Sequence, residues 1–441
     1  MSLYEKDSIV ALATPRGIGA LAVIRVSGES LSSLFSKLTG IKKIKSRYAY
    51  YSPLVSMGGE ILDNVIITFY RGPASFTGED VLEISCHGGE IVSKTIIHDL
   101  VERGCRYASP GEFSKRAFLN GKINLAEAES MNNIINAKSR LGAQRGLMEL
   151  NGSARDFLLK TKDSLIELLT IIEHELDFVE SEITELSNSV FKNKIGKSLE
   201  LIQSVLEGSL IGNKLQSGFK VGLVGPPNAG KSSLFNSLLG YNHSIISPEK
   251  GTTRDALEVF VEINGFPVVL IDTAGHWSGK DELDALGIKK TEEVIQQADI
   301  LLAVDEKNPE KFIKSFSVNE KPVIYILSKS DLKKSLKTSS KILKISSIKN
   351  INIDSLLTRL STTIEASFFK EDVFLCSARQ IILLKKARGA LLGLNKDLLD
   401  IELVERAVIV RTVVDLMREI FGDIYSEDIL NNIFKGFCVG K

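Results

Sequence analysis

The pattern of apolar and polar positions differs between successive stretches of the chain. Up to about residue 118, short apolar runs such as SIVALAT and LAVIRVSG are separated by Gly and Pro turns, which indicates mixed α and β structure. From about 123 to 210 the apolar residues recur at helical spacing without proline, as in SARDFLLKTKDSLIELLTIIEHELDFV. This second stretch predicts long antiparallel helices.

An alternation of strands and helices begins at FKVGLVG. We predict a mostly parallel sheet covered on both faces, with strands at 219–225, 256–263, 267–272, 299–305, 322–327 and 341–345. Beyond about 370 the pattern is helical again, in ARQIILLKKARGALLGLNKDLL, ELVERAVIVRTVVDLMREIFG and SEDILNNIFKGF. Since helical segments flank the α/β stretch, we expect a discontinuous helical domain with the α/β domain inserted into it.

The length agrees with a multidomain α+β protein, because 441 residues suffice for about three domains. The expected boundaries are an N-terminal α+β domain at 1–118, a helical-bundle domain in two parts at 119–216 and 371–441, and an α/β domain at 217–370.

Composition restricts the possible functions. The 55 basic and 55 acidic residues balance, which argues against a protein that simply coats nucleic acid by neutralising phosphates. The start MSLYEKDSIVALATP is unlike a signal peptide, and no apolar run reaches the roughly 18 residues of a membrane span. The four cysteines are scattered without a C-x-x-C pair, as is usual in a reducing cytosol. We therefore expect a cytoplasmic protein without a membrane anchor.

The segment GPPNAGKSS, Gly225 to Ser233, matches G-x-x-x-x-G-K-[ST] between a predicted strand and a predicted helix. Backbone N–H groups of such a loop cradle phosphates at a helix N-terminus, where the helix dipole favours anions. Lys231 adds positive charge at the β and γ phosphates, and the Ser232 hydroxyl can ligate Mg²⁺. The segment therefore predicts a nucleotide site.

Two further motifs follow in the order of a Ras-like GTPase. In KGTTRD, Thr253 is the natural second Mg²⁺ ligand. In DTAG, Asp272 would reach the metal through water, and the Gly275 N–H would meet the γ-phosphate. This order predicts that the nucleotide is GTP.

The segment SKSD stands where such GTPases carry N-K-x-D. Asp331 can accept from the two guanine N–H donors, and Lys329 can pack its stem over the base. Ser328 lacks the usual carboxamide, so we expect a weaker base contact and a weaker bridge to the phosphate loop, each worth about 0.5–1.5 kcal/mol. The alternative is that guanine selectivity has been lost. The residues expected to bind GTP are Asn228, Ala229, Gly230, Lys231, Ser232, Ser233, Ser247, Pro248, Glu249, Lys250, Gly251, Thr252, Thr253, Asp272, Thr273, Ala274, Gly275, Ser328, Lys329, Asp331, Ser346, Ser347 and Ile348.

Segments throughout the chain point to one family. They are DSIVALATPRGIGALAVIRVSG, SFTGEDVLEISCHGG, SPGEFSKRAFLNGKINLAEAE, GPPNAGKSSLFNSLLG, GTTRD and the final FCVGK. With these segments the sequence resembles the MnmE (TrmE) family of tRNA-modification GTPases nearly end to end. The GTPase motifs alone would also suit a ribosome-assembly GTPase that binds RNA, but no KH-type GxxG or RNP aromatic pattern stands beside them. A third reading is a folate-binding scaffold whose G domain is only a switch.

The resemblance implies an N-terminal folate-binding and dimerisation domain, a discontinuous helical bundle and an inserted Ras-like P-loop GTPase domain. It implies a homodimer that works in a heterotetramer with the flavoprotein MnmG (GidA). Together they would add an aminomethyl-type group to C5 of the tRNA wobble uridine. The implied cofactors are GTP, Mg²⁺, K⁺ and a tetrahydrofolate derivative, the 5-formyl or 5,10-methylene form, with FAD only in the partner.

Site residues follow from the same resemblance. A carboxylate can pair with pterin N–H donors and basic groups suit anionic parts of a folate, and the matching positions are Arg25, Glu83, Lys122 and Lys441. A K⁺ ion would supply positive charge at the phosphates, as an arginine finger does in other GTPases. The matching K⁺ ligands are Asn228, Ser247, Glu249 and Thr252.

The sequence departs from the family after DTAG, where it reads HWSGKDELDALGIKK. Trp277 stands where an Arg is usual, and Asp284 stands where a Glu positions the hydrolytic water. Asp is one methylene shorter than Glu, and a small misplacement of a reacting group can be costly. Glu282 is the alternative positioning residue. We expect GTP hydrolysis that is slower than is typical of the family.

The chain ends on FCVGK, which matches the family's C-x-G-K ending. Gly440 and Lys441 do not suit a prenylation signal, which requires aliphatic residues before the last position. We expect the tail to dock inward and to bring Cys438 and Lys441 toward the folate domain. Cys438 would act there as a nucleophile or as a positioning group, and the sequence leaves both roles open.

Overall fold

In a computed structural model of the 441-residue chain, the structure describes residues 7–177, 188–241, 257–272, 283–318, 320–332, 340–369, 372–398 and 400–440. Contacts between residues divide the chain into two units. The first combines both ends of the chain, residues 1–132 and 418–441, and the second contains residues 133–417.

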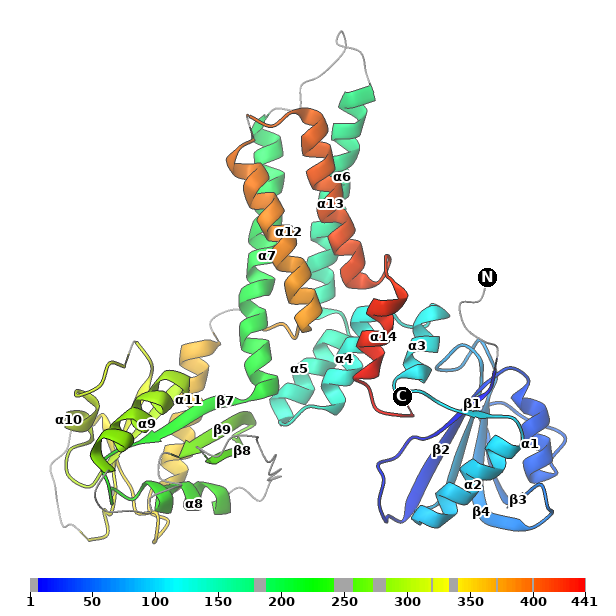
Figure 1. The fold of residues 1–441 in the computed structure, drawn as a ribbon, viewed down its shortest axis with the longest axis horizontal. Helices are drawn as coiled ribbons and strands as arrows, with labels where there is room; N and C mark the ends of the chain where they lie inside the picture. Colours follow the sequence, from blue (N-terminus) through cyan, green and yellow to red (C-terminus); the bar gives the residue numbers. More distant parts are fainter. Residues whose placement is uncertain are drawn as a thin grey trace. The chain divides into compact units, whose positions relative to one another are not determined.

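A six-stranded sheet forms the centre of the first unit, with strand order β3-β4-β5-β2-β1-β6 (Figure 1). Neighbouring strands are antiparallel except β1 and β6. The strands are β1 (Ile9–Leu12), β2 (Leu21–Gly28), β3 (Ala49–Val55), β4 (Ile61–Tyr70), β5 (Asp80–His87) and β6 (Arg106–Tyr107). The mixed α and β structure predicted for this stretch is confirmed.

Two helices, α1 (Leu31–Thr39) and α2 (Glu90–Glu102), cover one face of this sheet. Alternate strand residues such as Ile24 and Ile84 are fully buried beneath them. Because successive side chains in a strand point to opposite faces, Arg25 and Glu83 lie on the other face. That face therefore carries the polar chemistry of the first unit.

The last helix of the chain, α14 (Glu427–Lys435), packs in the first unit with α3 (Glu112–Leu119) and the start of α4 (Leu125–Ile135). Their small core contains Leu125, Leu430, Phe434 and Phe437. The Ser426 hydroxyl caps α14 by accepting from the Ile429 N–H, at 3.3 Å. This packing fixes the point from which the C-terminal tail starts.

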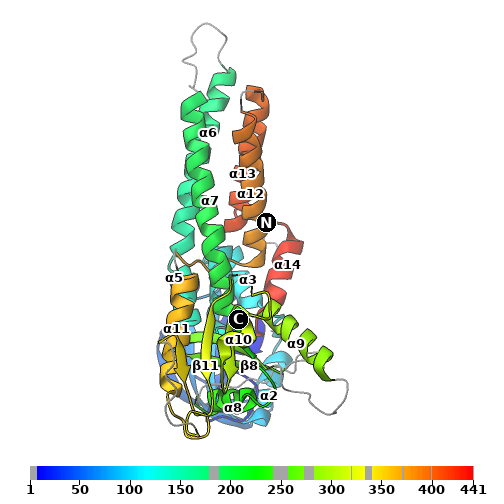
Figure 2. The same ribbon diagram turned by 90° about the vertical axis from the view of Figure 1, so that its left-hand side faces the viewer.

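Long helices form one part of the second unit, and four of them lie side by side in both ribbon views (Figures 1 and 2). These four are α6 (Ser153–Asp177), α7 (Asn188–Ser217), α12 (Ala378–Lys396) and α13 (Leu403–Phe421), with α5 (Arg140–Leu150) preceding them. An ion pair between Arg411 and Glu173 joins α13 to α6. The helices predicted for these stretches are confirmed.

The second sheet has strand order β12-β11-β10-β7-β9-β8, and only β8 is antiparallel to its neighbour. Helices α8 (Lys231–Tyr241) and α11 (Ile353–Phe368) cover one face, and α9 (Leu283–Gln297) and α10 (Pro309–Ile313) cover the other. The strands are β7 (Phe219–Val224), β8 (Leu257–Ile263), β9 (Phe266–Asp272), β10 (Ile300–Asp305), β11 (Val323–Leu327) and β12 (Ile342–Lys344). All six predicted strands are present.

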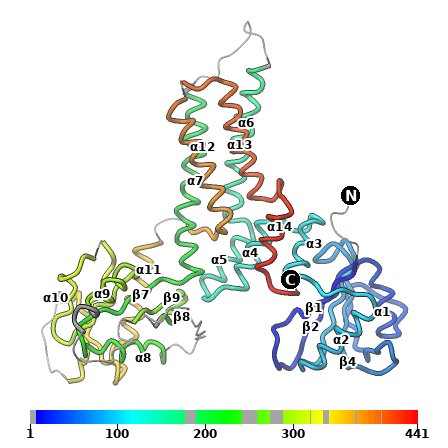
Figure 3. The backbone as a smooth tube through the Cα atoms, viewed as in Figure 1, coloured from blue at the N-terminus to red at the C-terminus, as the bar shows by residue number. Residues whose placement is uncertain are grey.

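The α/β part is an insertion between two helical parts, as predicted. The chain passes from α7 into β7 and returns after α11 to α12, a path that Figure 3 shows. The return segment lies directly on α7, because a Cβ at Gly208 or Gly212 would be 2.1 Å from the Asp372 carbonyl oxygen or 2.0 Å from that of Phe374. The buried Glu149 carboxylate accepts from the Leu375 N–H at 3.2 Å and so holds the same segment. The fold class expected from the sequence is thereby confirmed.

Among the helices of the described ranges, none combines the length and the apolar character that crossing a membrane requires.

Candidate functional sites

The phosphate loop lies between β7 and α8, where the sequence predicts it. Lys231, the first residue of α8, is 5% exposed, and its ammonium donates to the carbonyl oxygens of Gly225 and Pro226, both at 2.9 Å. Burial lowers the pKa of Lys231, and the charge of Asp272 at the end of β9 offsets this only in part. Lys231 is therefore held inside its own loop by neutral acceptors, which a phosphate group can replace.

The loop has two residues with left-handed backbone, Asn228 at φ 60° and Gly230 at φ 91°. Alternation of this kind turns successive N–H groups into a concave anion site. Lys329 spans this loop from outside, since its ammonium donates to the Asn228 carbonyl oxygen at 2.9 Å and to the Glu306 carboxylate at 3.2 Å. The geometry suits a bound phosphate chain flanked by the Lys329 stem.

Ser328 connects the base-reading segment to the phosphate loop. Its hydroxyl donates to the Ala229 carbonyl oxygen at 2.6 Å, and the side chain is buried. We expected a weaker bridge here because serine lacks the carboxamide of asparagine. The shorter side chain still reaches the loop with this hydrogen bond, and the expected weakness of the bridge relative to asparagine stays a prediction.

The last two segments that the sequence predicts to contact the base meet at Asp331. A hydrogen bond with the Ser346 hydroxyl lowers the pKa of Asp331, and the Ser330 N–H donates to the Ile345 carbonyl oxygen at 3.0 Å. Asp331 is therefore an ionised carboxylate at neutral pH and can only accept hydrogen bonds. An acceptor of this kind matches the N–H donors of guanine.

In the first unit, Arg25 and Glu83 face each other across β2 and β5, whose register pairs them directly. Arg25 donates to the Oε1 atom of Glu83 from Nη2 at 2.7 Å and from Nε at 3.1 Å. The guanidinium also lies over the rings of Phe76 and Phe113, 5.8 and 5.9 Å from their centroids. The two side chains are 22% and 29% exposed, so a ligand can reach them.

The C-terminal tail docks on this site. Arg25 Nη1 donates to the Gly440 carbonyl oxygen at 3.3 Å, and the Gly111 N–H donates to the Cys438 carbonyl oxygen at 3.4 Å. Gly440 has φ +99°, and a Cβ there would lie 2.6 Å from the Leu12 carbonyl oxygen. The inward docking expected from the sequence is confirmed as far as Gly440.

Comparison with known proteins identifies a family that combines the same domains. The family described as GTP-binding protein TrmE N-terminus matches residues 8–122, and the MnmE helical domain matches residues 125–438. The tRNA modification GTPase MnmE of Aquifex aeolicus is 34% identical over 447 residues, which cover 99% of this chain and 100% of the relative. That of Clostridioides difficile is 33% identical and covers 100% of both chains. The chain belongs to the MnmE family of tRNA-modification GTPases.

Many residues that the MnmE resemblance singles out lie outside the described residues. These are Ser247, Pro248, Glu249, Lys250, Gly251, Thr252, Thr253, Thr273, Ala274, Gly275, Trp277, Glu282 and Lys441. Asp284 is the second residue of α9, and its side chain is not among those described. Ser232 and Ser233 lie in the first turn of α8, and Ser347 and Ile348 follow Ser346 in a turn.

The hydrogen bond of the Lys122 ammonium is with a neighbouring loop and not with the Arg25–Glu83 pair. Its ammonium donates to the Pro73 carbonyl oxygen at 2.9 Å. Pro73 belongs to the loop that also contains Phe76, so Lys122 and Arg25 contact the same loop. The structure therefore brings Arg25, Glu83 and Gly440 together, and Lys122 contacts the loop that carries Phe76.

Tyr70 is a member of this site that the sequence argument missed. Its hydroxyl donates to the Oε2 atom of Glu83 at 3.3 Å. Burial, reinforced by the charge of Glu83, raises the pKa of Tyr70, so the phenol keeps its proton. The sequence did contain a signal for Tyr70. Successive side chains of β4 point to opposite faces of the sheet, so Tyr70 lies on the same face as Thr68. Thr68 pairs directly with Glu83 of β5.

Cys438 is the exposed member of the four cysteines, and the other three are buried. Burial raises the pKa of both Cys86 and Cys105 to about 11, which suppresses their thiolates at neutral pH. Cys438 is thus the thiol that a substrate can reach.

Proposed function

We propose that this MnmE-family protein is a potassium-dependent GTPase that, with the flavoprotein MnmG, adds an aminomethyl-type group to C5 of the tRNA wobble uridine. A tetrahydrofolate derivative would be the one-carbon donor. The observation that carries the proposal is the match to MnmE relatives over 99–100% of the chain, which includes both the nucleotide loops and the tail site.

The nucleotide part of the proposal rests on Lys231, Ser328 and Asp331. Lys231 would exchange its carbonyl acceptors for the β and γ phosphates, and Asp331 would accept from guanine. Mg²⁺ would be held by Ser232 and Thr253. K⁺ would be held by Asn228, Ser247, Glu249 and Thr252, where it would supply positive charge at the phosphates.

The residues of the tail site fit a folate. The Glu83 carboxylate is a fixed acceptor for pterin N–H donors, because Arg25 holds one of its oxygens and Tyr70 the other. The Phe76 ring offers an apolar surface beside them. Lys122 and Lys441 would contribute positive charge toward the glutamate portion. When bound, the folate supplies the one-carbon unit.

Two residues would serve the chemistry itself. Asp284 would position the hydrolytic water, and Cys438, whose backbone is anchored at Gly111, would act on or beside the one-carbon unit.

The proposed assembly is a homodimer that joins MnmG in a heterotetramer and acts on tRNA in the cytoplasm, with FAD only in MnmG. The alternative, a ribosome-assembly GTPase that binds RNA as a switch, does not account for residues 8–122, which match the TrmE N-terminus. No observation favours it over the family assignment.

Reconstitution tests the proposal. The full-length protein, MnmG, unmodified tRNA, GTP, 5,10-methylene-tetrahydrofolate and an amine donor are incubated in K⁺ or in Na⁺, and tRNA nucleosides are analysed by mass spectrometry. We expect C5-modified wobble uridine in K⁺ only, together with GTP hydrolysis that K⁺ stimulates and Na⁺ does not. Modification that proceeds without GTP or folate, or equally in Na⁺, would contradict the proposal.

A further inference from the structure

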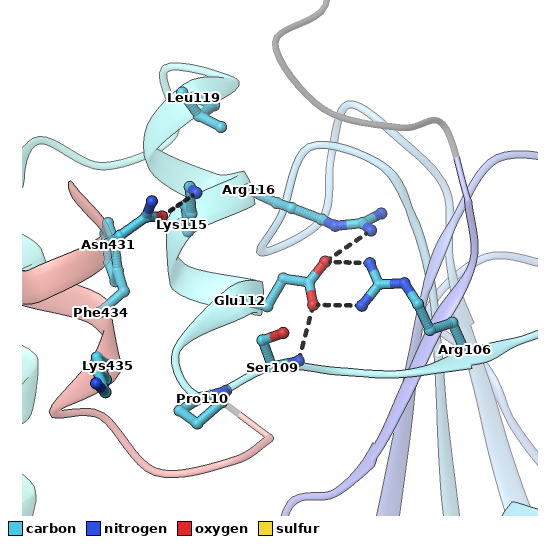
Figure 4. A pocket seen from close by; sticks show the side chains of 10 residues that line it. All are labelled: Arg106, Ser109, Pro110, Glu112, Lys115, Arg116, Leu119, Asn431, Phe434 and Lys435. Carbon is cyan, nitrogen blue, oxygen red and sulfur yellow. Dashed lines mark hydrogen bonds and ion pairs between the residues drawn. The ribbon is translucent and has the colours of Figure 1, made fainter. Parts of the chain in front are cut away.

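A hollow in the first unit lies between α3 and α14. It has a volume of about 300 Å³. Figure 4 shows Lys115 of α3 pointing toward Asn431 of α14, and the ion pairs of Glu112 with Arg106 and Arg116 on the other side of α3. The residues that matter for its chemistry are Pro110, Lys115, Leu119, Asn431, Phe434 and Lys435.

Two lysine ammonium groups at this hollow have no carboxylate partner among the residues that the structure describes. Lys115 donates to the Asn431 Oδ1 atom at 2.7 Å, which is a neutral acceptor. Lys435 lies one helical turn beyond Asn431 on the same face of α14 and is exposed. Within the part of the chain that the structure describes, no carboxylate lies within ion-pair distance of either lysine.

The carboxylate of Glu112 also lines the hollow, and it is already paired with two arginines. Glu112 pairs with Arg106 at 2.7 Å and with Arg116 at 3.0 Å. Burial acts to raise the pKa of Glu112, but these bonds to Arg106 and Arg116 outweigh it, and the net pKa is lowered. Glu112 therefore stays ionised within its own pairs and does not offset the charge of Lys115 and Lys435.

The donors at the hollow match an acceptor-only anion. Because a lysine can only donate, the carboxamide oxygen of Asn431 faces Lys115, and the amide N–H groups of Asn431 remain donors. Pro110, Leu119 and Phe434 line the same hollow with apolar surface that suits a ribose or a base. The positive charge, the hydrogen-bond donors and the apolar lining together match a nucleotide with its phosphate group.

We infer that the hollow between α3 and α14 binds a phosphodiester group of the tRNA substrate through Lys115, Asn431 and Lys435. The inference rests on the proposed function, which supplies the tRNA. The whole chain has equal numbers of basic and acidic residues, so its attraction for RNA has to come from local unneutralised charges such as these.

The test measures binding of fluorescein-labelled, unmodified tRNA to the full-length protein by anisotropy over a salt series. The double variant Lys115→Gln/Lys435→Gln removes both charges and keeps polar side chains that are one atom shorter, and Lys115→Arg/Lys435→Arg keeps the charges. Lys94→Gln is the matched control, because Lys94 is exposed on α2 and is paired with Glu90. Circular dichroism melting curves check that all variants fold.

We expect the double Gln variant to bind tRNA about tenfold more weakly near 0.1 M salt, with a log–log salt slope smaller by about 1.4–1.8, the effect of two lost phosphate contacts. The double Arg variant and the Lys94→Gln control keep the wild-type affinity and slope. If the double Gln variant keeps both as well, the hollow does not hold RNA and the inference is overturned. If the wild-type protein fails to bind tRNA at any salt concentration, the proposed tRNA substrate fails first, and this inference fails with it.

Discussion

Arg25 donates a hydrogen bond from Nη1 to the carbonyl oxygen of Gly440, at 3.3 Å, although 415 positions separate the two residues. The same guanidinium holds Glu83 at 2.7 Å. The site therefore combines a side-chain pair on the sheet with a backbone group of the tail. Its shape depends on the conformation of the last residues as much as on their side chains.

Gly440→Ala should displace the tail. Gly440 has φ +99°, and a Cβ would lie 2.6 Å from the Leu12 carbonyl oxygen, so alanine cannot occupy this position without movement. Strain of this kind costs about 1–3 kcal/mol, and we expect the affinity for 5-formyl-tetrahydrofolate to fall about tenfold. Calorimetric titration measures this affinity. Gly436→Ala is the control, because its φ is −81° and a Cβ would meet nothing closer than 3.7 Å. Equal folate affinity in both variants would show that the tail has no part in the site.

Ser328→Ala should weaken guanine nucleotide binding. The variant loses the hydrogen bond at 2.6 Å to the Ala229 carbonyl oxygen and so loosens the phosphate loop. At about 0.5–1.5 kcal/mol for one bond, the dissociation constant of fluorescent GDP should rise about 2- to 12-fold. In the control Ser315→Ala, the lost hydroxyl bonds the Phe312 carbonyl oxygen at the end of α10, outside the nucleotide loops. If both variants bind GDP equally well, the Ser328 bridge does not support the loop.

Asp284 should make GTP hydrolysis slower than a glutamate at the same position would. Asp284→Glu restores the missing methylene, and we expect the K⁺-stimulated turnover number to rise several-fold, whereas Asp284→Ala should lower it about a hundredfold. Steady-state phosphate release measures both. Glu282→Gln separates the two candidate acids, since it should leave the rate unchanged. A normal rate in Asp284→Ala together with a loss in Glu282→Gln would transfer the role to Glu282.

Glu112→Gln should destabilise the first unit in a pH-dependent way. The pKa of Glu112 is lowered in the folded state, so its contribution to stability is present above the ordinary glutamate pKa and is lost as the pH falls through the folded-state pKa. At neutral pH the variant leaves Arg116, whose side chain is 2% exposed, with Asp7 and Glu79 as its remaining ion-pair partners, at a cost of about 1–3 kcal/mol. Melting curves should show a lower Tm at pH 7 that converges with the wild-type Tm in acid. Glu90→Gln removes only an exposed ion pair with Lys94 on α2 and should show a much smaller difference. A difference between Glu112→Gln and the wild type that is constant with pH would refute the linkage.

Cys438 should react first with thiol reagents. At pH 8 a thiol with a pKa of about 11, such as Cys86 or Cys105, is ionised in about one molecule per thousand, and both are also buried. We expect one fast equivalent per chain with a disulfide reagent, and Cys438→Ser should abolish it. A fast phase that persists in Cys438→Ser would mean that a buried cysteine becomes accessible.

The nucleotide part of the fold could be predicted from the sequence because local patterns determine it. In β9, for example, Leu270 and Ile271 are both fully buried, one on each face of the sheet, and such a continuous apolar run identifies a strand of a covered parallel sheet. The loop before Lys231 likewise follows from its glycines and its place between strand and helix. The boundaries proposed for the individual domains stay predictions.

The tail site could not be derived from spacing. Arg25 and Glu83 are 58 positions apart, and only the register of β2 against β5 makes them neighbours. Tyr70 joins them through β4 for the same reason. The reach of Ser328 to Ala229 is also a tertiary distance, so the sequence alone could not show that the serine hydroxyl bonds the phosphate loop.

The most direct test of the central claim is mass spectrometry of tRNA nucleosides from cells that lack this protein. We predict that the C5 aminomethyl-type modification of the wobble uridine is lost, that the wild-type chain restores it, and that Lys231→Ala does not. An unchanged amount of C5-modified wobble uridine in the deletion cells would contradict the account.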